Sequence, residues 1–181
     1  MSGHRAAPAG APGPPGPPAP PGAMLRVGVT NDGARAAVSA ERLAAAARHV
    51  LRAEGVRDAM LSITLLTATA MARLNRRHLG HAGATDVISF GFTPTPGGAG
   101  GPGGAGAGVV GDIYICPDVA RRNARAERCG VREELLRLVI HGTLHVLGWD
   151  HPVDTDRAAS PMWKRQERLL ATLLRHRARR A

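Results

Sequence analysis

The run HGTLHVLGWDH, residues 141–151, constrains this chain more than any other part of its sequence. Residues four apart on a helix differ by only about 40° in azimuth, so His141 and His145 share one face. Gly148 is suited to end that helix in a left-handed conformation, which brings His151 back toward the same face. Three neutral imidazoles that leave a fourth position to water form the arrangement of a catalytic zinc site. The spacing therefore predicts a metal centre formed by His141, His145 and His151.

The segment before the first histidine, from Leu135 to Ile140, is almost wholly apolar. Two histidines four apart occur often by chance, and most such pairs are solvated or hydrogen-bonded in a core. In a buried helix the ring nitrogens need partners, and a metal ion supplies them. A structural zinc site would need four protein ligands, and the neighbouring sequence offers no fourth candidate. We therefore expect one zinc ion per chain, held at a catalytic site.

The same run matches the zinc-protease pattern H-E-x-x-H-x-x-G-x-x-H at its histidines and its glycine. The protease uses the glutamate of that pattern as general base, whereas this chain has Gly142, which has no side chain. A proton acceptor must then come from elsewhere, and Asp150 is the nearest carboxylate in the sequence. Two interpretations of Asp150 stay open: the base itself, or a group that orients an imidazole. A zinc metallopeptidase or another zinc hydrolase is an alternative on these residues alone.

The chain has 181 residues, enough for one domain with a hydrophobic core, and a formal net charge of +10. An excess of this size favours polyanionic partners, RNA among them. No apolar stretch approaches the length of a membrane span, so we expect no membrane partner. Two cysteines, Cys116 and Cys129, are too few for a disulfide framework, which is typical of a cytoplasmic protein with reduced thiols. The sequence leaves the oligomeric state open.

Two low-complexity segments flank and interrupt the expected domain. Residues 1–23 are rich in Pro, Gly and Ala, so we predict a disordered extension there, and Met24 is a candidate for the natural start. Residues 94–108 are mainly Gly, with Ala and Pro, which predicts a flexible loop between two strands. We place the domain at residues 24–176 and a basic tail at 177–181.

Strand and helix patterns alternate within the domain. Strands are expected at 25–29, 59–66, 86–91 and 110–115. Helices are expected at about 39–52, at 67–77, from Pro117, over 131–147 and from Ser160 onward. Ser39, Thr67 and Ser160 are expected to cap three of these helices. The alternation predicts a single α/β domain of the mixed α+β type. We expect a mixed, mostly four-stranded sheet packed with about five helices, and the zinc site on a central helix and the following turn.

Three blocks of sequence occur together: the histidine run at 141–151, Leu74-Asn75 followed by TDVISF at 85–90, and GDIYIC at 111–116. With the order of the elements, they resemble the YbeY family of bacterial metal-dependent endoribonucleases over roughly residues 24–175. The resemblance implies zinc binding by His141, His145 and His151. It implies a single-strand-specific endoribonuclease in rRNA processing, at the 3′ end of small-subunit rRNA, and in ribosome quality control. It also implies association with the ribosome or its small subunit.

The chain departs from the family at one position. Between the Leu-Asn pair and the Thr-Asp block the family carries an arginine, thought to contact substrate phosphate, and that position holds Leu79. Arg76 and Arg77 lie close by and are candidate replacements, because a guanidinium can bind a phosphate bidentately. Their other interpretation is the solvated end of a helix. Leu79 also leaves open a catalytically weak ribosome-binding module.

Overall fold

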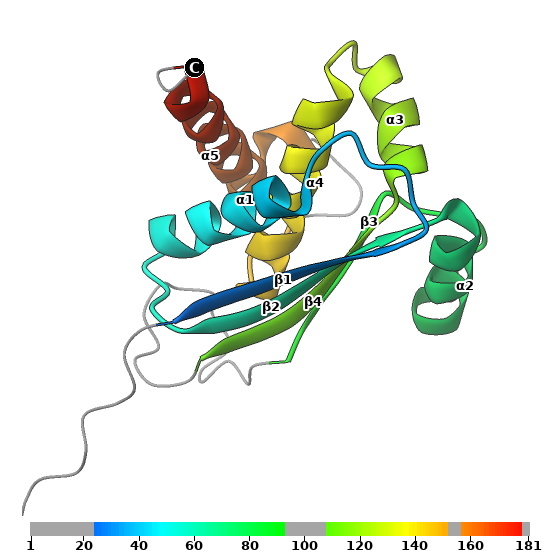
Figure 1. Cartoon of the computed structure of the whole chain (residues 1–181), viewed down its shortest axis with the longest axis horizontal. Coiled ribbons are helices and arrows are strands. Elements are labelled where there is room, and N and C mark those ends of the chain that lie inside the picture. Colours follow the sequence, from blue (N-terminus) through cyan, green and yellow to red (C-terminus); the bar gives the residue numbers. More distant parts are fainter. Residues whose placement is uncertain (1–23, 93–107, 152–156, 179–181) are drawn as a thin grey trace, which may run out of the picture.

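A computed structural model describes residues 24–92, 108–151 and 157–178 of the chain (Figure 1). Its strands are β1 (Leu25–Asp32), β2 (Ala59–Leu66), β3 (Val87–Gly91) and β4 (Val109–Ile115). They form one sheet in the order β1-β2-β4-β3, in which β1, β2 and β4 are parallel and β3 is antiparallel to β4. The predicted mixed four-stranded sheet is confirmed.

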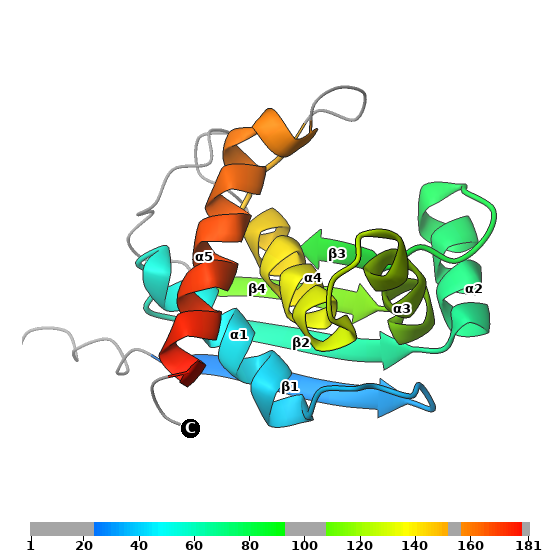
Figure 2. The ribbon, with the colours of Figure 1, turned by 90° about the horizontal axis from the view of Figure 1, so that it is seen from above.

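The helices are α1 (Ala40–Ala53), α2 (Ala68–Leu79), α3 (Pro117–Ala126), α4 (Val131–Val146) and α5 (Pro161–Ala178), and a short 3-10 helix spans Arg157–Ala159. Figures 1 and 2 show α1, α4 and α5 on one side of the sheet, with α2 beyond the ends of the parallel strands. Helix α4 packs against β3 and β4 and also against α1, α3 and α5. The helix that carries the histidine run is therefore the central helix of the fold, as predicted.

Alternation along the strands gives the sheet two different faces. Leu61 and Ile63 face the helices and are buried, whereas Met60 on the other face is 56% exposed. Leu66 joins Met71 in a second, smaller cluster where α2 covers the end of that other face. We call the remainder the open face. It consists of Arg26, Gly28, Thr30, Met60, Ser62, Thr64, Phe90, Val110, Asp112 and Tyr114, which the strand register places in adjoining rows.

Local hydrogen bonding explains where three helices begin. The side-chain oxygens of Ser39, Thr67 and Ser160 accept hydrogen bonds from the backbone N–H groups of Arg42, Ala70 and Trp163. These N-caps are confirmed. Strand β1 is longer than predicted, because the polar residues up to Asp32 pair through their backbone with β2.

Some predicted segments cannot be compared with the structure. The predicted extension at 1–23, residues 94–107 of the predicted loop and residues 179–181 of the predicted tail lie outside the described residues. The first two residues of that tail belong to α5, which ends at Ala178. None of the helices in the described ranges combines the length and the apolar character needed to cross a membrane.

Candidate metal centre

Three histidines converge at the C-terminal end of α4. His141 and His145 lie one turn apart on this helix. Gly148 follows with a φ of 85°, and its N–H donates to the carbonyl of His145 at 2.9 Å, so the chain reverses there. One ring nitrogen from each of His141, His145 and His151 then lies within 4.8 Å of the other two. The structure thus brings together the three residues that the sequence predicts, through a left-handed glycine.

The arrangement of these rings fits a divalent metal ion. All three histidines are half-buried, and the Nε2 atoms of His141 and His145 lie 3.1 Å apart. Two nitrogens that bind one tetrahedral zinc ion are about 3.3 Å apart, given Zn–N distances of about 2.0–2.1 Å. The observed separation is close to that value. His141, His145 and His151 could therefore hold a metal ion.

Gln166 determines which nitrogen of His141 faces the cluster. Its carboxamide comes from α5, the residue is only 1% exposed, and its Nε2 donates to Oε1 of Glu167 at 3.0 Å. Its Oε1 therefore faces Nδ1 of His141, 2.8 Å away, and accepts the hydrogen of that nitrogen. With its hydrogen on Nδ1, a neutral His141 keeps the lone pair of Nε2 directed at the cluster. This is the tautomer that a metal ligand at Nε2 requires.

Arg137 holds Glu167, the residue that accepts the hydrogen bond from Gln166. Its guanidinium bonds to the carboxylates of Glu133, Glu134 and Glu167 at 2.8, 2.6 and 3.0 Å. Burial acts to lower the pKa of Arg137, but the hydrogen bond to Glu134 and the charge of Glu167 outweigh it and raise the pKa above its ordinary value. The guanidinium therefore stays charged and holds Glu167 where it accepts from Gln166.

Sequence reasoning did not identify Gln166, Glu167 or Arg137 as part of this site. One signal was present. Gln166 is a polar residue at helical spacing from the buried Met162 and Leu169. A buried carboxamide needs hydrogen-bond partners, so its place in that apolar stripe pointed to a polar group on the neighbouring helix.

Position 142 has no room for the glutamate of the protease pattern. Gly142 is buried, and a Cβ atom there would lie 2.7 Å from Cγ2 of Ile113 in β4. Strand β4 comes equally close one turn further along, where a Cβ on Gly111 would lie 2.5 Å from Cγ1 of Val146. The contact between α4 and the sheet therefore requires glycine at 142. A metallopeptidase at this site would therefore need Asp150 as its general base.

Asp150 holds the backbone of the turn that carries the third histidine. Its Oδ1 accepts a hydrogen bond from the N–H of His151 at 2.8 Å, and the residue is exposed. This contact positions His151 through the main chain. The role of Asp150 as a base stays a prediction.

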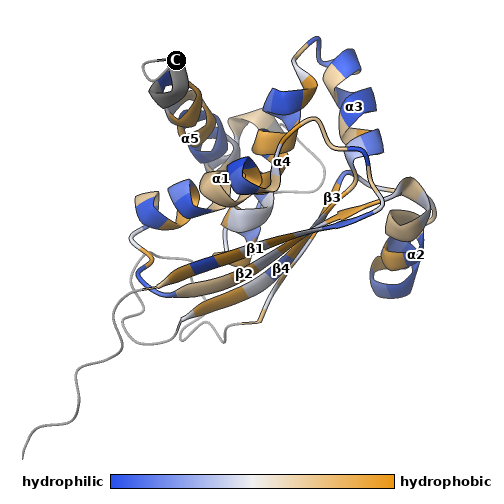
Figure 3. Ribbon diagram, in the orientation of Figure 1, coloured by the Kyte–Doolittle hydropathy of each residue, from blue (hydrophilic) through white to orange (hydrophobic). Residues whose placement is uncertain are grey.

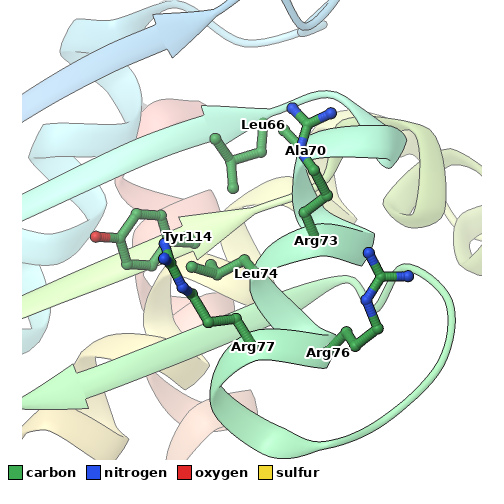
Figure 4. Close-up of a pocket in the computed structure, with 7 residues that line it drawn as sticks. All are labelled: Leu66, Ala70, Arg73, Leu74, Arg76, Arg77 and Tyr114. Atoms are coloured by element: carbon green, nitrogen blue, oxygen red, sulfur yellow. The ribbon is translucent and has the colours of Figure 1, made fainter.

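Arg76 and Arg77 do not share the histidine cluster. Both are exposed residues in the last turn of α2. With Arg73 they line a hollow that includes Tyr114 and none of the three histidines (Figure 4). Leu79 is 47% exposed at the end of the same helix. The two arginines therefore lie at the edge of the open face, in the same hollow as Tyr114.

The block made of Leu74-Asn75 and TDVISF contains residues that hold the loop between α2 and β3. The Nδ2 of buried Asn75 donates to the carbonyl of Gly83 at 2.9 Å. Asp86 accepts from the N–H of Val87 at 2.9 Å and from Nδ2 of Asn123 in α3 at 2.9 Å. These contacts join the loop to α2 and α3, so both polar residues have structural roles.

The fold and the site define a single α/β domain with a candidate metal centre of three histidines. A family model described as Endoribonuclease YbeY matches residues 29–174. The chain belongs to the YbeY family. This confirms the resemblance seen in the sequence and the expected class of enzyme, an endoribonuclease, which is a hydrolase.

Curated relatives and one solved structure cover most of the chain. Endoribonuclease YbeY of Frankia casuarinae is 38% identical over 151 residues, which span 82% of this chain and 74% of the relative. Endoribonuclease YbeY of Beutenbergia cavernae is 40% identical over 139 residues, or 76% and 90% of the two chains. The solution structure of TM1509 from Thermotoga maritima matches with a TM-score of 0.56 at 22% identity, over 85% of this chain and 93% of the other. This last likeness supports the fold alone.

Proposed function

We propose that the histidine cluster is a zinc site and that it makes this chain a single-strand-specific endoribonuclease of ribosomal RNA. The observation that carries the proposal is the convergence of His141, His145 and His151 within 4.8 Å. Family membership supports RNA as the substrate, and the net charge of +10 favours a polyanion. The resemblance extends the proposal to 3′-end maturation of small-subunit rRNA and to ribosome quality control. We further propose that the enzyme acts in the cytoplasm, in contact with the ribosome or its small subunit.

In this mechanism the residues of the chain hold and orient the groups that react. A bound zinc ion supplies Lewis-acid chemistry for the attack of water on a phosphodiester. His141, His145 and His151 would hold the ion, and Gln166 keeps the hydrogen of His141 on Nδ1. Asp150 keeps the turn of His151 in place and is the candidate acceptor for the proton of the attacking water.

The variant His141→Ala tests the zinc site and the activity together. We expect it to lose stoichiometric zinc, measured by elemental analysis, and cleavage of single-stranded RNA. His49→Gln in α1, outside the cluster, is the matched control and should keep both. Wild-type zinc content and cleavage in His141→Ala would refute the proposal. Cleavage of duplex RNA at an equal rate would refute the strand specificity, and release of peptides from casein would favour the peptidase alternative.

Leu79 favours a second candidate function, a catalytically weak ribosome-binding module. The family arginine is absent at this position, and Arg76 and Arg77 line a hollow apart from the histidines. This alternative predicts co-sedimentation with ribosomes and no RNA cleavage with zinc, manganese or magnesium. The cleavage that we propose requires activity with at least one of these ions.

A further inference from the structure

Three arginines form a positive ridge along one side of α2. Arg73, Arg76 and Arg77 are exposed, and they line a hollow of about 500 Å³ together with Leu66, Leu74 and Tyr114 (Figure 4). Arg73 and Arg76 also line a second hollow of about 460 Å³. The last turns of α2 are the hydrophilic part of this helix (Figure 3). We call Arg73, Arg76 and Arg77 the α2 ridge.

The charge of the α2 ridge is not balanced within the described part of the chain. Spacings of three and four residues place these side chains beside one another, and like charges at such spacings repel. No ion pair among the described residues includes any of the three, whereas Arg121, Arg137 and Arg165 all pair with carboxylates. Three neighbouring positive charges with no internal counter-charge attract an anion from outside the protein.

An aromatic surface adjoins the ridge. Figure 4 shows Arg77 extending over Leu74 toward the ring of Tyr114 on β4. The rings of Phe90 and Tyr114 form a T-shaped pair with centroids 6.1 Å apart, and His78 of α2 packs on Phe90 with a centroid distance of 5.5 Å. The hydroxyl of Tyr114 donates to Oδ2 of Asp112 at 3.4 Å, which restrains the ring. Tyr114 is thus a supported aromatic side chain at the margin of a cationic ridge.

The distribution of charge suits a nucleotide. Asp112 beside Tyr114 repels a phosphate from the ring but not a neutral base, while the α2 ridge attracts the phosphate. A polyanion without bases would gain nothing from Tyr114, and a duplex hides the base faces that an aromatic ring stacks on.

We propose that the α2 ridge and Tyr114 form a binding surface for single-stranded RNA, separate from the three histidines. The arginines contact successive phosphates, and Tyr114 stacks on a base. The proposal rests on the proposed function only in taking RNA as the substrate. It makes Arg76 and Arg77 determinants of RNA affinity, in place of the catalytic role for which the sequence made them candidates.

The test compares two triple variants of the full-length protein that lose the same charge. One variant, the α2 triple variant, replaces Arg73, Arg76 and Arg77 by Ala. The other, the helical-layer variant, replaces Arg52 of α1, Arg132 of α4 and Arg168 of α5 by Ala. All six arginines are exposed. Binding of a labelled oligouridine is measured on ice by fluorescence anisotropy over a range of salt concentrations, and gels verify that the probe stays intact. The α2 triple variant should bind at least about tenfold more weakly and lower the salt slope by about 2, since each phosphate contact in single-stranded RNA contributes roughly 0.7. The helical-layer variant should retain more than half of the wild-type affinity.

Tyr114 is tested separately with Tyr114→Leu and Tyr114→Phe. Loss of the ring should weaken binding by about tenfold without a change in the salt slope, whereas Tyr114→Phe keeps a stacking surface and should bind like the wild type. Circular dichroism checks that each variant is folded. Should Tyr114→Leu fail to fold, Tyr114→Ile, whose β-branched side chain suits a strand, provides the second measurement of the same loss.

Three results would overturn the proposal. These are unchanged affinity in the α2 triple variant, equal weakening in the helical-layer variant, or equal competition by polyglutamate or duplex RNA. Binding and cleavage are read independently. A chain that binds oligouridine through the α2 ridge but never cleaves RNA contradicts the proposed function alone. A chain that cleaves RNA with wild-type affinity after the triple substitution contradicts this proposal alone.

Discussion

Nδ1 of His141 on α4 lies 2.8 Å from Oε1 of Gln166 on α5. The orientation of the carboxamide is fixed because its nitrogen donates to Glu167, and Arg137 holds Glu167 in turn. A residue of one helix thereby sets the protonation pattern of a candidate metal ligand on another. Gln166 acts through His141 and is a positioning residue of the site.

Gln166→Leu should weaken zinc binding by about 10- to 100-fold, because His141 loses the acceptor that keeps its hydrogen on Nδ1. Competition with a chelating indicator measures the affinity, and imidazole nitrogen chemical shifts report the tautomer of His141. The matched control is Met162→Leu, a buried change of similar volume on the same helix. An unaltered zinc affinity in Gln166→Leu would contradict the positioning role.

Gly142→Ala should lower the free energy of unfolding by about 1–2 kcal/mol, since the added methyl group would overlap the fully buried Ile113. The overlap outweighs the gain in helix propensity from Gly to Ala, which is about 1 kcal/mol. Urea denaturation gives the value, and Gly28→Ala on the open face, where nothing lies within 4 Å, is the control.

A double-mutant cycle tests whether the side chains at positions 142 and 113 press on each other. Ile113→Ala alone leaves a cavity, and Gly142→Ala placed on that background should partly fill it. The two changes together should then cost at least about 1 kcal/mol less than their sum. Strict additivity would show that the two positions do not press on each other.

Arg137→Lys should destabilise the fold by about 1–2 kcal/mol, because one ammonium cannot bond to three carboxylates in the geometry that a guanidinium provides. Glu134, which is only 6% exposed, loses most from the change. Arg132→Lys, at an exposed position of the same helix, should stay within about 0.5 kcal/mol of the wild type. Equal denaturation midpoints for the two variants would show that the geometry of the guanidinium at position 137 adds nothing to the stability of the fold.

Tyr114 should ionise above the ordinary tyrosine pKa of about 10. Burial raises the pKa of its hydroxyl, and the charge of Asp112 raises it further. Because the folded-state pKa lies above the unfolded one, the associated stability is present below the ordinary pKa and is lost as pH rises through the raised value.

The chain has a single tyrosine, so the ultraviolet absorbance of tyrosinate reports this group alone. Asp112→Asn should move the midpoint of the alkaline titration down, yet leave it above the ordinary value, because burial is the larger cause. A wild-type midpoint at or below the ordinary value is the result that disagrees.

Local chemistry made much of the fold predictable. Ser39, Thr67 and Ser160 stand directly before apolar periodic segments, and each accepts the N–H three residues later. The histidine cluster was predictable for the same reason, since a spacing of four on a helix and a left-handed Gly148 are both local properties. The end of β1 was not, because Asp32 is held by backbone pairing with a strand that follows α1.

The support of the site could not be read from local pattern. Gln166 is 25 residues from His141 along the chain, and only the packing of α5 on α4 brings them together. The sequence likewise shows that Gly142 stands where the protease pattern has a glutamate, but not that Ile113 occupies the space beside it. The sequence offered Arg76 and Arg77 as candidate phosphate ligands, but their location in one hollow with Tyr114 depends on how α2 packs at the end of the sheet.

The contact between Gly142 and Ile113 also restricts how such a sequence can diverge. A side chain at position 142 costs stability while Ile113 is present, and a smaller residue at 113 costs stability while Gly142 is present. The route from this histidine site to a glutamate-assisted one therefore passes through a less stable ancestor. The packing of one helix on one strand thus makes substitutions at these two positions depend on each other.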